Sequence, residues 1–422
     1  MIRKAFIAAV TGILLLLLAV YSYLQYRQYS SYQNSIPRNA SLIFKINVDR
    51  IVKRKRLNPF KSSSRGFAVP ANIFVYNLNN KPAQTFFCAL PVTDTALLKQ
   101  YLKSEFRISQ LTEVHPGVRT GNSADRRLRV IYNSSRLVLS YALLNEDTSP
   151  ELERLLHEKD LMIPGDPRME RLKKQEADIA YDFKSYTGTA NFNAHSLSLN
   201  GSFPIGALGV PDSSYAPANL QKGLSIKMWL NADLKNVLPQ NLRFKTCFLE
   251  RDTILKYYAG YTAVECGAML SQYEPVITYE YNDEFEKAEK TQLKEVRVPA
   301  ISITCKLKSP VLISYLQKQA IISPENRFNH ELFPLYQVYS MHNSKFWQLS
   351  TNQTNPLPQT LQPSSYFAFA AINFDQLRKQ NQFPVLNSYM QYLKQLELKA
   401  TKQNATDGKI ELELQLSEKA AF

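Results

Sequence analysis

The stretch IPRNASLIFKINVDRIVKRKR, residues 36–56, supplies the unit from which this chain is built. Pro37 marks a turn, and residues 41–48 are rich in the apolar and β-branched side chains that favour a strand. Asp49 follows at once, and Asp is a good N-cap because its carboxylate accepts from the free amides of a first helical turn. The stretch therefore predicts a strand followed by a capped helix.

The same strand ending recurs along the chain. Asn-x-Asp follows an apolar run at 47–49, 145–147, 231–233 and 373–375. Asn and Asp end strands and cap helices, so cap chemistry alone accounts for the pattern. An internal duplication accounts for it equally well, and both explanations stay open.

Two alternating segments suggest how the chain is divided. NFNAHSLSLNGSF (191–203) and KIELELQL (409–416) each alternate apolar and polar residues, as a half-buried strand does. Between them, GVPDSSYAPANLQKG (209–223) has the composition of a linker. Strands and helices mix without a βαβ rhythm, so we expect an α+β fold with mainly antiparallel sheets. We place it in two halves, 37–208 and 224–422, for which a duplication is one of the two explanations left open above.

Further elements follow from local patterns. We expect a hairpin of 336–341 with 345–350, paired strands at 71–77 and 84–91, and helices at 94–106 and 383–398. The acidic segment EYNDEFEKAE (280–289) is interpreted as the start of a helix, where carboxylates are favourable.

An uncharged run near the N-terminus predicts a membrane location. AFIAAVTGILLLLLAVYSYL (5–24) is long enough to cross a bilayer as a helix, and Arg3 and Lys4 precede it. We expect a transmembrane signal anchor in the inner (cytoplasmic) membrane, with residues 1–4 cytoplasmic, 25–36 a juxtamembrane linker and the bulk of the chain periplasmic. A cleaved signal peptide is the alternative, which the bulky residues after the run disfavour.

The formal net charge of +15 would ordinarily suggest nucleic acid as a partner, but export argues against it. The lipid bilayer is the expected partner instead. One dense basic group could rest on anionic headgroups, or could be a solvated face: Arg50, Lys53, Arg54, Lys55 and Arg56.

The four cysteines are spaced too widely for a zinc ribbon or a C-x-x-C pair. Cys88 lies in the apolar run TFFCALPV and is expected to be a buried free thiol. Four cysteines allow three disulfide connectivities, and Cys247 with Cys266 is the pair we favour if one forms.

No catalytic signature can be assembled. G-x-S-x-G, S-x-x-K and H-E-x-x-H are absent, and 13 glycines supply no phosphate-binding loop. The five histidines stand far apart in sequence. We therefore predict no catalytic residue, no metal ligand and no cofactor.

The pattern I-P-x-x-A-S-L-I-F-K-I-N-x-D after a single apolar segment resembles uncharacterised families of single-pass, membrane-anchored envelope proteins of Gram-negative bacteria. The resemblance covers residues 36–51 and the two-part layout. It implies a location and a two-part exported domain, and it carries over no functional residue.

The sequence therefore favours a noncatalytic envelope protein whose exported domain binds or scaffolds another envelope protein or lipid. Two alternatives stay open: an extracytoplasmic enzyme with a dispersed site, which needs histidines or a His with a carboxylate to meet in a pocket, and a lipid or glycan carrier.

Overall fold

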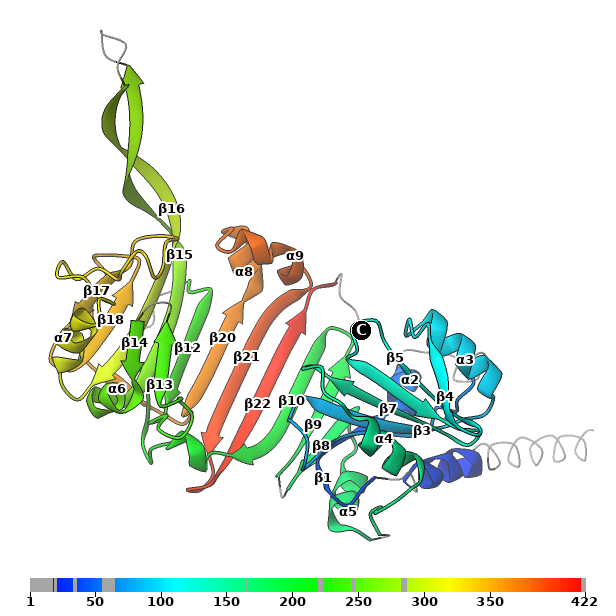
Figure 1. Cartoon of the computed structure of the whole chain (residues 1–422). Helices are drawn as coiled ribbons and strands as arrows, with labels where there is room; N and C mark the ends of the chain where they lie inside the picture. Colours follow the sequence, from blue (N-terminus) through cyan, green and yellow to red (C-terminus); the bar gives the residue numbers. More distant parts are fainter. Residues whose placement is uncertain are drawn as a thin grey trace, which may run out of the picture. The chain divides into compact units, whose positions relative to one another are not determined.

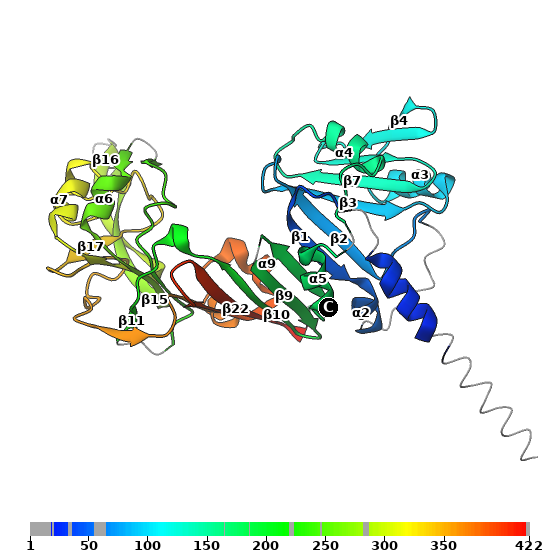
Figure 2. The same ribbon diagram turned by 90° about the horizontal axis from the view of Figure 1, so that it is seen from below.

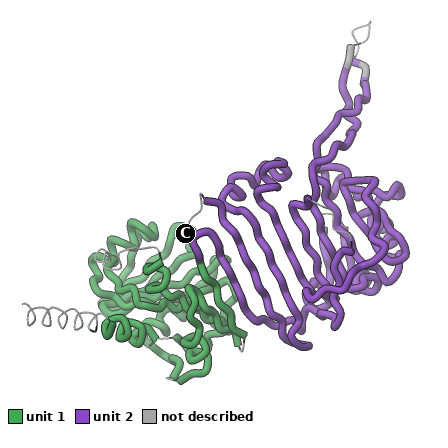
Figure 3. Tube along the Cα trace, turned by 180° about the vertical axis from the view of Figure 1, so that it is seen from behind, with its two compact units in different colours: residues 1–192 green, residues 193–422 purple. Residues whose placement is uncertain are grey.

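The computed structural model describes residues 18, 21–32, 36–54, 65–163, 165–184, 186–218, 223–244, 247–281 and 287–418. The chain has two compact units, residues 1–192 and 193–422 (Figure 3). Eighteen strands belong to one large, mostly antiparallel sheet. This overturns the predicted α+β fold of two halves, because antiparallel strand pairing, with few and short helices, organises the described chain.

Unit 1 is a sheet with helices on both faces (Figure 1). Its strands run in the order β9-β8-β1-β2-β3-β7-β6-β5-β4. Their bounds are β1 (Ala40–Asn47), β2 (Asn72–Leu78), β3 (Thr85–Pro91), β4 (Leu111–His115), β5 (Val118–Asn122), β6 (Leu128–Tyr132), β7 (Arg136–Ala142), β8 (Ile179–Phe183) and β9 (Tyr186–Asn193).

Side-chain alternation places different helices on the two faces of this sheet. Leu98 and Leu102 of α3 (Thr95–Ser104) pack with one set of β6 and β7 residues, which includes Val130. Leu152 of α4 (Ser149–Leu156) packs with the opposite set, which includes Val138. Figure 2 shows α4 next to β7. The helices α2 (Val48–Arg54) and α5 (Pro167–Lys174) complete the unit.

A helix at 21–31 packs against unit 1 in the region predicted to be a linker. Arg27 forms an ion pair of 2.9 Å with Asp49, and Asn72 Nδ2 donates to Gln28 and to the buried Ser31. None of the helices in the described part of the chain combines the length and apolarity of a membrane crossing. This finding corrects the predicted transmembrane signal anchor at 5–24; residues 5–17, 19 and 20 of that segment lie outside the described residues.

Unit 2 is also built on a sheet, with strands in the order β10-β22-β21-β20-β12-β15-β16-β18-β17. Their bounds are β10 (Ser196–Pro204), β12 (Ile226–Asn231), β15 (Tyr258–Tyr281), β16 (Lys287–Leu307), β17 (Tyr339–His342), β18 (Phe346–Ser350), β20 (Ala368–Asn373), β21 (Leu393–Lys402) and β22 (Asp407–Leu416). Two ribbons accompany it: β11 (Ser214–Pro217) with β19 (Leu361–Ser364), and β13 (Asn241–Phe244) with β14 (Cys247–Glu250).

Helices are few in unit 2. Leu312, Ile313 and Leu316 of α7 (Val311–Lys318) form a core with Cys247, beside α6 (Arg251–Tyr257). The remaining short helices are η1 (Gly206–Leu208), α8 (Phe374–Lys379), η2 (Pro384–Leu386) and α9 (Asn387–Met390).

A two-stranded arm extends from unit 2 (Figure 1). It consists of residues 273–281 of β15 and 287–295 of β16, which pair with each other beyond the stretches bonded to β12 and β18. Gln272 fixes its base: Nε2 donates to the carbonyls of Gln337 and Thr351, at 2.8 and 2.6 Å. The predicted helix at 280–289 is wrong at both of its ends, because 280 and 281 belong to β15 and 287–289 to β16; residues 282–286 lie outside the described residues.

Seven strands have the same order in both units. The order β9-β8-β1-β2-β3-β7-β6 in unit 1 corresponds to β21-β20-β12-β15-β16-β18-β17 in unit 2. In each unit one strand ends at the Asn of an Asn-x-Asp motif: β1 in unit 1 and β12 in unit 2. β1 pairs with β2 and with β8, and β12 pairs with β15 and with β20. The second partner follows about 140 residues later in each case.

The Asn of the repeated motif has the capping role that we predicted for Asp49. Asn47 Oδ1 accepts from the amide of Arg50, and Asn373 Oδ1 accepts from the amide of Gln376 at the start of α8. After Asn231 the described chain forms a turn, with Leu234 at φ 62°, and no helix begins there.

Several local predictions are confirmed: β1, the β2–β3 pair, the helix α3, the β17–β18 hairpin and β22. Asp94, predicted to lie within the helix, is its N-cap. Two are wrong. Residues 191–203 form two strands with a turn between them, and the predicted helix at 383–398 is only η2 and α9 before β21 begins.

Candidate ligand-binding site

The candidate site is a cavity of about 410 Å³ on one face of the unit 2 sheet. Residues of β15, β16 and β18 line one side of it, and the segment 355–361 lines the other. Pro356 and Pro358 lie in that segment. Since proline fixes φ, the segment has few conformations to lose when it lies over the sheet.

Strand register brings a row of polar side chains under this segment. Ala263 of β15 pairs with Thr304 of β16, which pairs with Gln348 of β18. Residues directly opposite in a sheet point to the same face. Thr304 and Gln348 are only 6% and 3% exposed, although a buried strand face is normally apolar.

Two oxygen atoms of this row have no hydrogen-bond partner among the residues that the structure describes. Gln348 Nε2 donates to Thr304 Oγ1 at 3.1 Å, which leaves Gln348 Oε1 buried and unpaired. Glu265, two residues beyond Ala263 on the same face, has a buried Oε1 that is unpaired as well. A buried acceptor without a donor costs about 1–3 kcal/mol, so a ligand that donates to both atoms would recover that free energy.

The electrostatic environment favours a positively charged ligand. Burial raises the pKa of Glu265, and Lys227, its cross-strand neighbour on β12, only partly offsets this. The Lys227 ammonium lies 5.2 Å from the ring centroid of Trp229 and 5.3 Å from that of Phe369, and burial lowers its pKa. Among the described residues that line the cavity there is no Lys or Arg.

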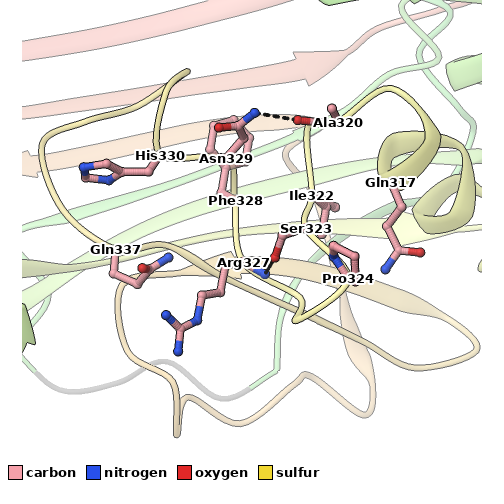
Figure 4. Close-up of a pocket in the computed structure, with 10 residues that line it drawn as sticks. All are labelled: Gln317, Ala320, Ile322, Ser323, Pro324, Arg327, Phe328, Asn329, His330 and Gln337. Atoms are coloured by element: carbon pink, nitrogen blue, oxygen red, sulfur yellow. Dashed lines mark hydrogen bonds between the residues drawn. The ribbon is translucent and has the colours of Figure 1, made fainter. Parts of the chain in front are cut away.

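A second hollow, of about 440 Å³, lies beside α7 (Figure 4). Figure 4 shows Gln317 of α7 on one side and His330 on the other, with Asn329 Nδ2 donating to the Ala320 carbonyl at 2.8 Å. None of the described residues that line it has a buried, unpaired side-chain nitrogen or oxygen. Unlike the cavity over β15, this hollow therefore offers a ligand no buried, unpaired polar atom among its described lining residues.

Unit 1 contains buried charges that are already paired. The carboxylates of Asp178 and Asp182 are fully buried; Asp178 pairs with Arg50 and Arg54, and Asp182 pairs with Arg171 at 2.6 Å. These pairs tie α2 and α5 to β8 and the segment before it. Both buried carboxylates are therefore compensated by arginines.

The predicted membrane-contact cluster is divided by these pairs. Arg50 and Arg54 are directed to Asp178, and Lys53 is exposed on α2. Lys55 and Arg56 lie outside the described residues.

All four cysteines are free thiols in the structure. The predicted pair lies in two separate environments: Cys247 is in the core beneath α7, whereas Cys266 Sγ lies 3.6 Å from Gln382 Oε1. Cys88 is a free thiol, as predicted, but it is half-buried and not fully buried; desolvation raises its pKa to about 12.

Within the described ranges, no three His, Cys, Asp or Glu side chains are placed to hold a metal ion. Of the histidines, only His330 lines one of the two hollows described above.

Neither Glu265 nor Gln348 was predicted from the sequence to be a site residue. The sequence feature that could have identified them is a polar residue at an inward-facing position of an otherwise apolar strand, as in KFWQLS (345–350). Which face of β18 is inward depends on pairing with a strand some 45 residues away, which the local pattern does not contain.

No family model matches the chain, and no curated protein matches it. Among solved structures, crystal form IV of TP0453 is 12% identical with a TM-score of 0.27, covering 40% of this chain and 81% of that one. Crystal form I of TP0453 is 10% identical with a TM-score of 0.23, covering 75% of this chain and 90% of that one. At these TM-scores the likeness carries no argument about fold or function.

Proposed function

We propose that unit 2 is a noncatalytic binding module that holds a ligand with an ammonium or guanidinium group in the cavity over β15, β16 and β18. The observation that carries the proposal is the pair of buried, unpaired acceptors, Glu265 Oε1 and Gln348 Oε1, that line one cavity. An ammonium has three donors and a guanidinium five, so either can satisfy both oxygens.

Charge favours such a ligand over a neutral alcohol. A carboxylate out of water is costly unless an opposite charge compensates it. Lys227 is stacked on two aromatic rings and supplies only part of that compensation. A ligand cation would supply the rest and would lower the pKa of Glu265 towards its ordinary value.

Binding is favoured over catalysis by what surrounds Glu265. In many general acid–base enzymes a second titratable group, such as a histidine or another carboxylate, lies within reach of the first. Among the described lining residues, Glu265 is the one carboxylate and histidine is absent; the other polar groups are amides, hydroxyls and the Tyr261 phenol, whose pKa burial raises. The arrangement can recognise a donor but lacks a partner for proton transfer.

Isothermal titration calorimetry with two probes of similar shape tests the proposal. We expect n-butylammonium to bind the full-length protein and n-butanol, which lacks the charge, to give no saturable heat. A probe this small binds weakly, with a dissociation constant on the order of 1 mM.

Matched variants assign the site. Glu265→Gln keeps the size of the side chain and removes its charge, so it should weaken n-butylammonium binding at least tenfold. Glu413→Gln, on the exposed part of β22, should leave binding unchanged. Equal binding by wild type and Glu265→Gln, or equal binding of the two probes, would refute the proposal.

A further inference from the structure

The two faces of the arm differ in character. Tyr273 and Tyr279 of β15 are 66% and 60% exposed, and Ile277 between them is 57% exposed. Pro275 pairs with Leu293, which is 71% exposed, so Leu293 lies on the same face. We call Tyr273, Pro275, Ile277, Tyr279 and Leu293 the apolar arm face.

The opposite face of the arm is polar. Glu274 pairs with Lys294, and Thr278 pairs with Lys290. An isolated two-stranded ribbon is marginally stable in water, and a contiguous exposed apolar patch marks an interaction surface. Burial of the apolar arm face against another surface would stabilise the ribbon and remove the apolar patch from water.

The rim of the apolar arm face is mainly acidic. Glu289 pairs with Tyr279 and Glu295 with Tyr273, so both carboxylates flank the exposed rings. Lys287 is the basic exception, with its ammonium 6.0 Å from the Tyr279 ring centroid. The partner of this face should therefore be apolar with a basic rim.

A surface of that character is present elsewhere on unit 2. Val385 and Tyr389 are 86% and 73% exposed, and Leu386 and Tyr392 are each 48% exposed. We call these four residues, on η2, α9 and the turn before β21, the tyrosine patch.

The rim of the tyrosine patch is basic. Between Asp375 and Glu397 the sequence has no acidic residue and three basic ones. Arg378 is bound to Asp375, whereas Lys379 and Lys394 are exposed. Charge and apolar character thus match those of the arm.

We propose that two copies of this chain form a symmetric dimer in which the apolar arm face of each copy docks on the tyrosine patch of the other. Both contacts are the same, so the dimer is closed and uses each surface once. The Gln272 clamp at the base of the arm fixes the direction in which the arm leaves the sheet. A preorganised arm loses less conformational entropy on docking than a free one.

Sedimentation velocity of the full-length protein, at concentrations up to about 100 µM, is the first test. We expect a monomer–dimer equilibrium for wild type. Ile277→Ser with Leu293→Ser should raise the dissociation constant at least tenfold, and so should Tyr389→Ser. Val276→Ser is the matched control, because Val276 lies on the polar face of the arm, and it should leave the equilibrium unchanged.

A charge exchange tests which surfaces meet. Glu289→Lys alone places a lysine on the arm that faces the basic patch, and Lys394→Glu alone places a glutamate in the patch that faces the acidic arm, so each variant alone should associate more weakly than wild type. Mixing the two variants pairs opposite charges at both contacts and should restore the dimer. A wild type that stays monomeric, a dimer insensitive to the arm variants, or a mixture that fails to associate would overturn the proposal.

Discussion

Lys45 Nζ lies 2.5 Å from the carbonyl oxygen of Leu172 and 2.6 Å from that of Gln175, at the C-terminal end of α5. The side chain is 1% exposed on β1. The carbonyls that a helix leaves free at its C-terminus are favourable partners for an ammonium. This lysine therefore attaches α5 to the centre of the unit 1 sheet, and its ammonium is buried as a result.

The burial of the Lys45 ammonium should be detectable in the pH dependence of the free energy of unfolding. Burial lowers the pKa of Lys45 from 10.5 to about 8, and Glu176 partly offsets the shift. Between about pH 8 and 10.5 the unfolded chain holds a proton that the folded chain has lost, so the free energy of unfolding rises with pH in this window. In Lys45→Met this rise should be smaller by about 1–3 kcal/mol. Urea unfolding at several pH values measures it, and identical pH profiles would contradict the assignment.

Removing the partner of a buried carboxylate should destabilise unit 1 strongly. Asp182 is fully buried against Arg171 of α5. Arg171→Ala leaves that charge unpaired and should cost about 3–5 kcal/mol. Lys173→Ala, on the same helix, removes an exposed pair with Glu170 and should cost under about 1 kcal/mol. Urea unfolding of both variants tests this, and similar losses for the two would show that Asp182 finds solvent or another donor.

Two substitutions of Asp94, the N-cap of α3, separate the effect of the capping hydrogen bonds from that of the charge. Asp94 accepts from the amides of Ala96 and Leu97, at 2.8 and 2.9 Å. Asp94→Ala should cost about 1 kcal/mol, whereas Asp94→Asn should cost only a few tenths, because Asn caps nearly as well. The midpoint of urea unfolding gives both values; equal losses would mean that the charge, and not the cap, matters.

The clamp at the base of the arm should be visible by hydrogen exchange. Gln272 donates to two carbonyls, and its Oε1 accepts from the amide of Gln337 at 3.1 Å. Gln272→Leu removes all three bonds, so the amide of Gln337 should exchange at least tenfold faster. Gln292→Leu, at an exposed position of β16, is the control. If the amide of Gln337 is equally protected in Gln272→Leu, the Gln272 side chain is not what protects it from exchange.

Local chemistry explains which elements the sequence predicted. Asp94 before an amphipathic run and the His342–Asn343 turn between two short strands are signals held within a few residues, and both elements are present. The arm was not predicted because the acidic segment 280–289 has the composition of a helix start, whereas Tyr279 and Glu289 are paired strand residues. Glu265 and Gln348 were missed because their common face depends on the pairing of β15, β16 and β18, which no local pattern specifies.

The pairing of β12 with β20 has a consequence for the order in which the chain is made. Trp229 faces Phe369, so one edge of β12 stays open while about 140 further residues are synthesised. At about 5–20 residues per second this takes roughly 7–28 s. Phe44 of β1 waits nearly as long for Tyr181 of β8. In each unit a central strand, β1 or β12, therefore leaves the ribosome with one edge unpaired until the returning strand, β8 or β20, has been synthesised.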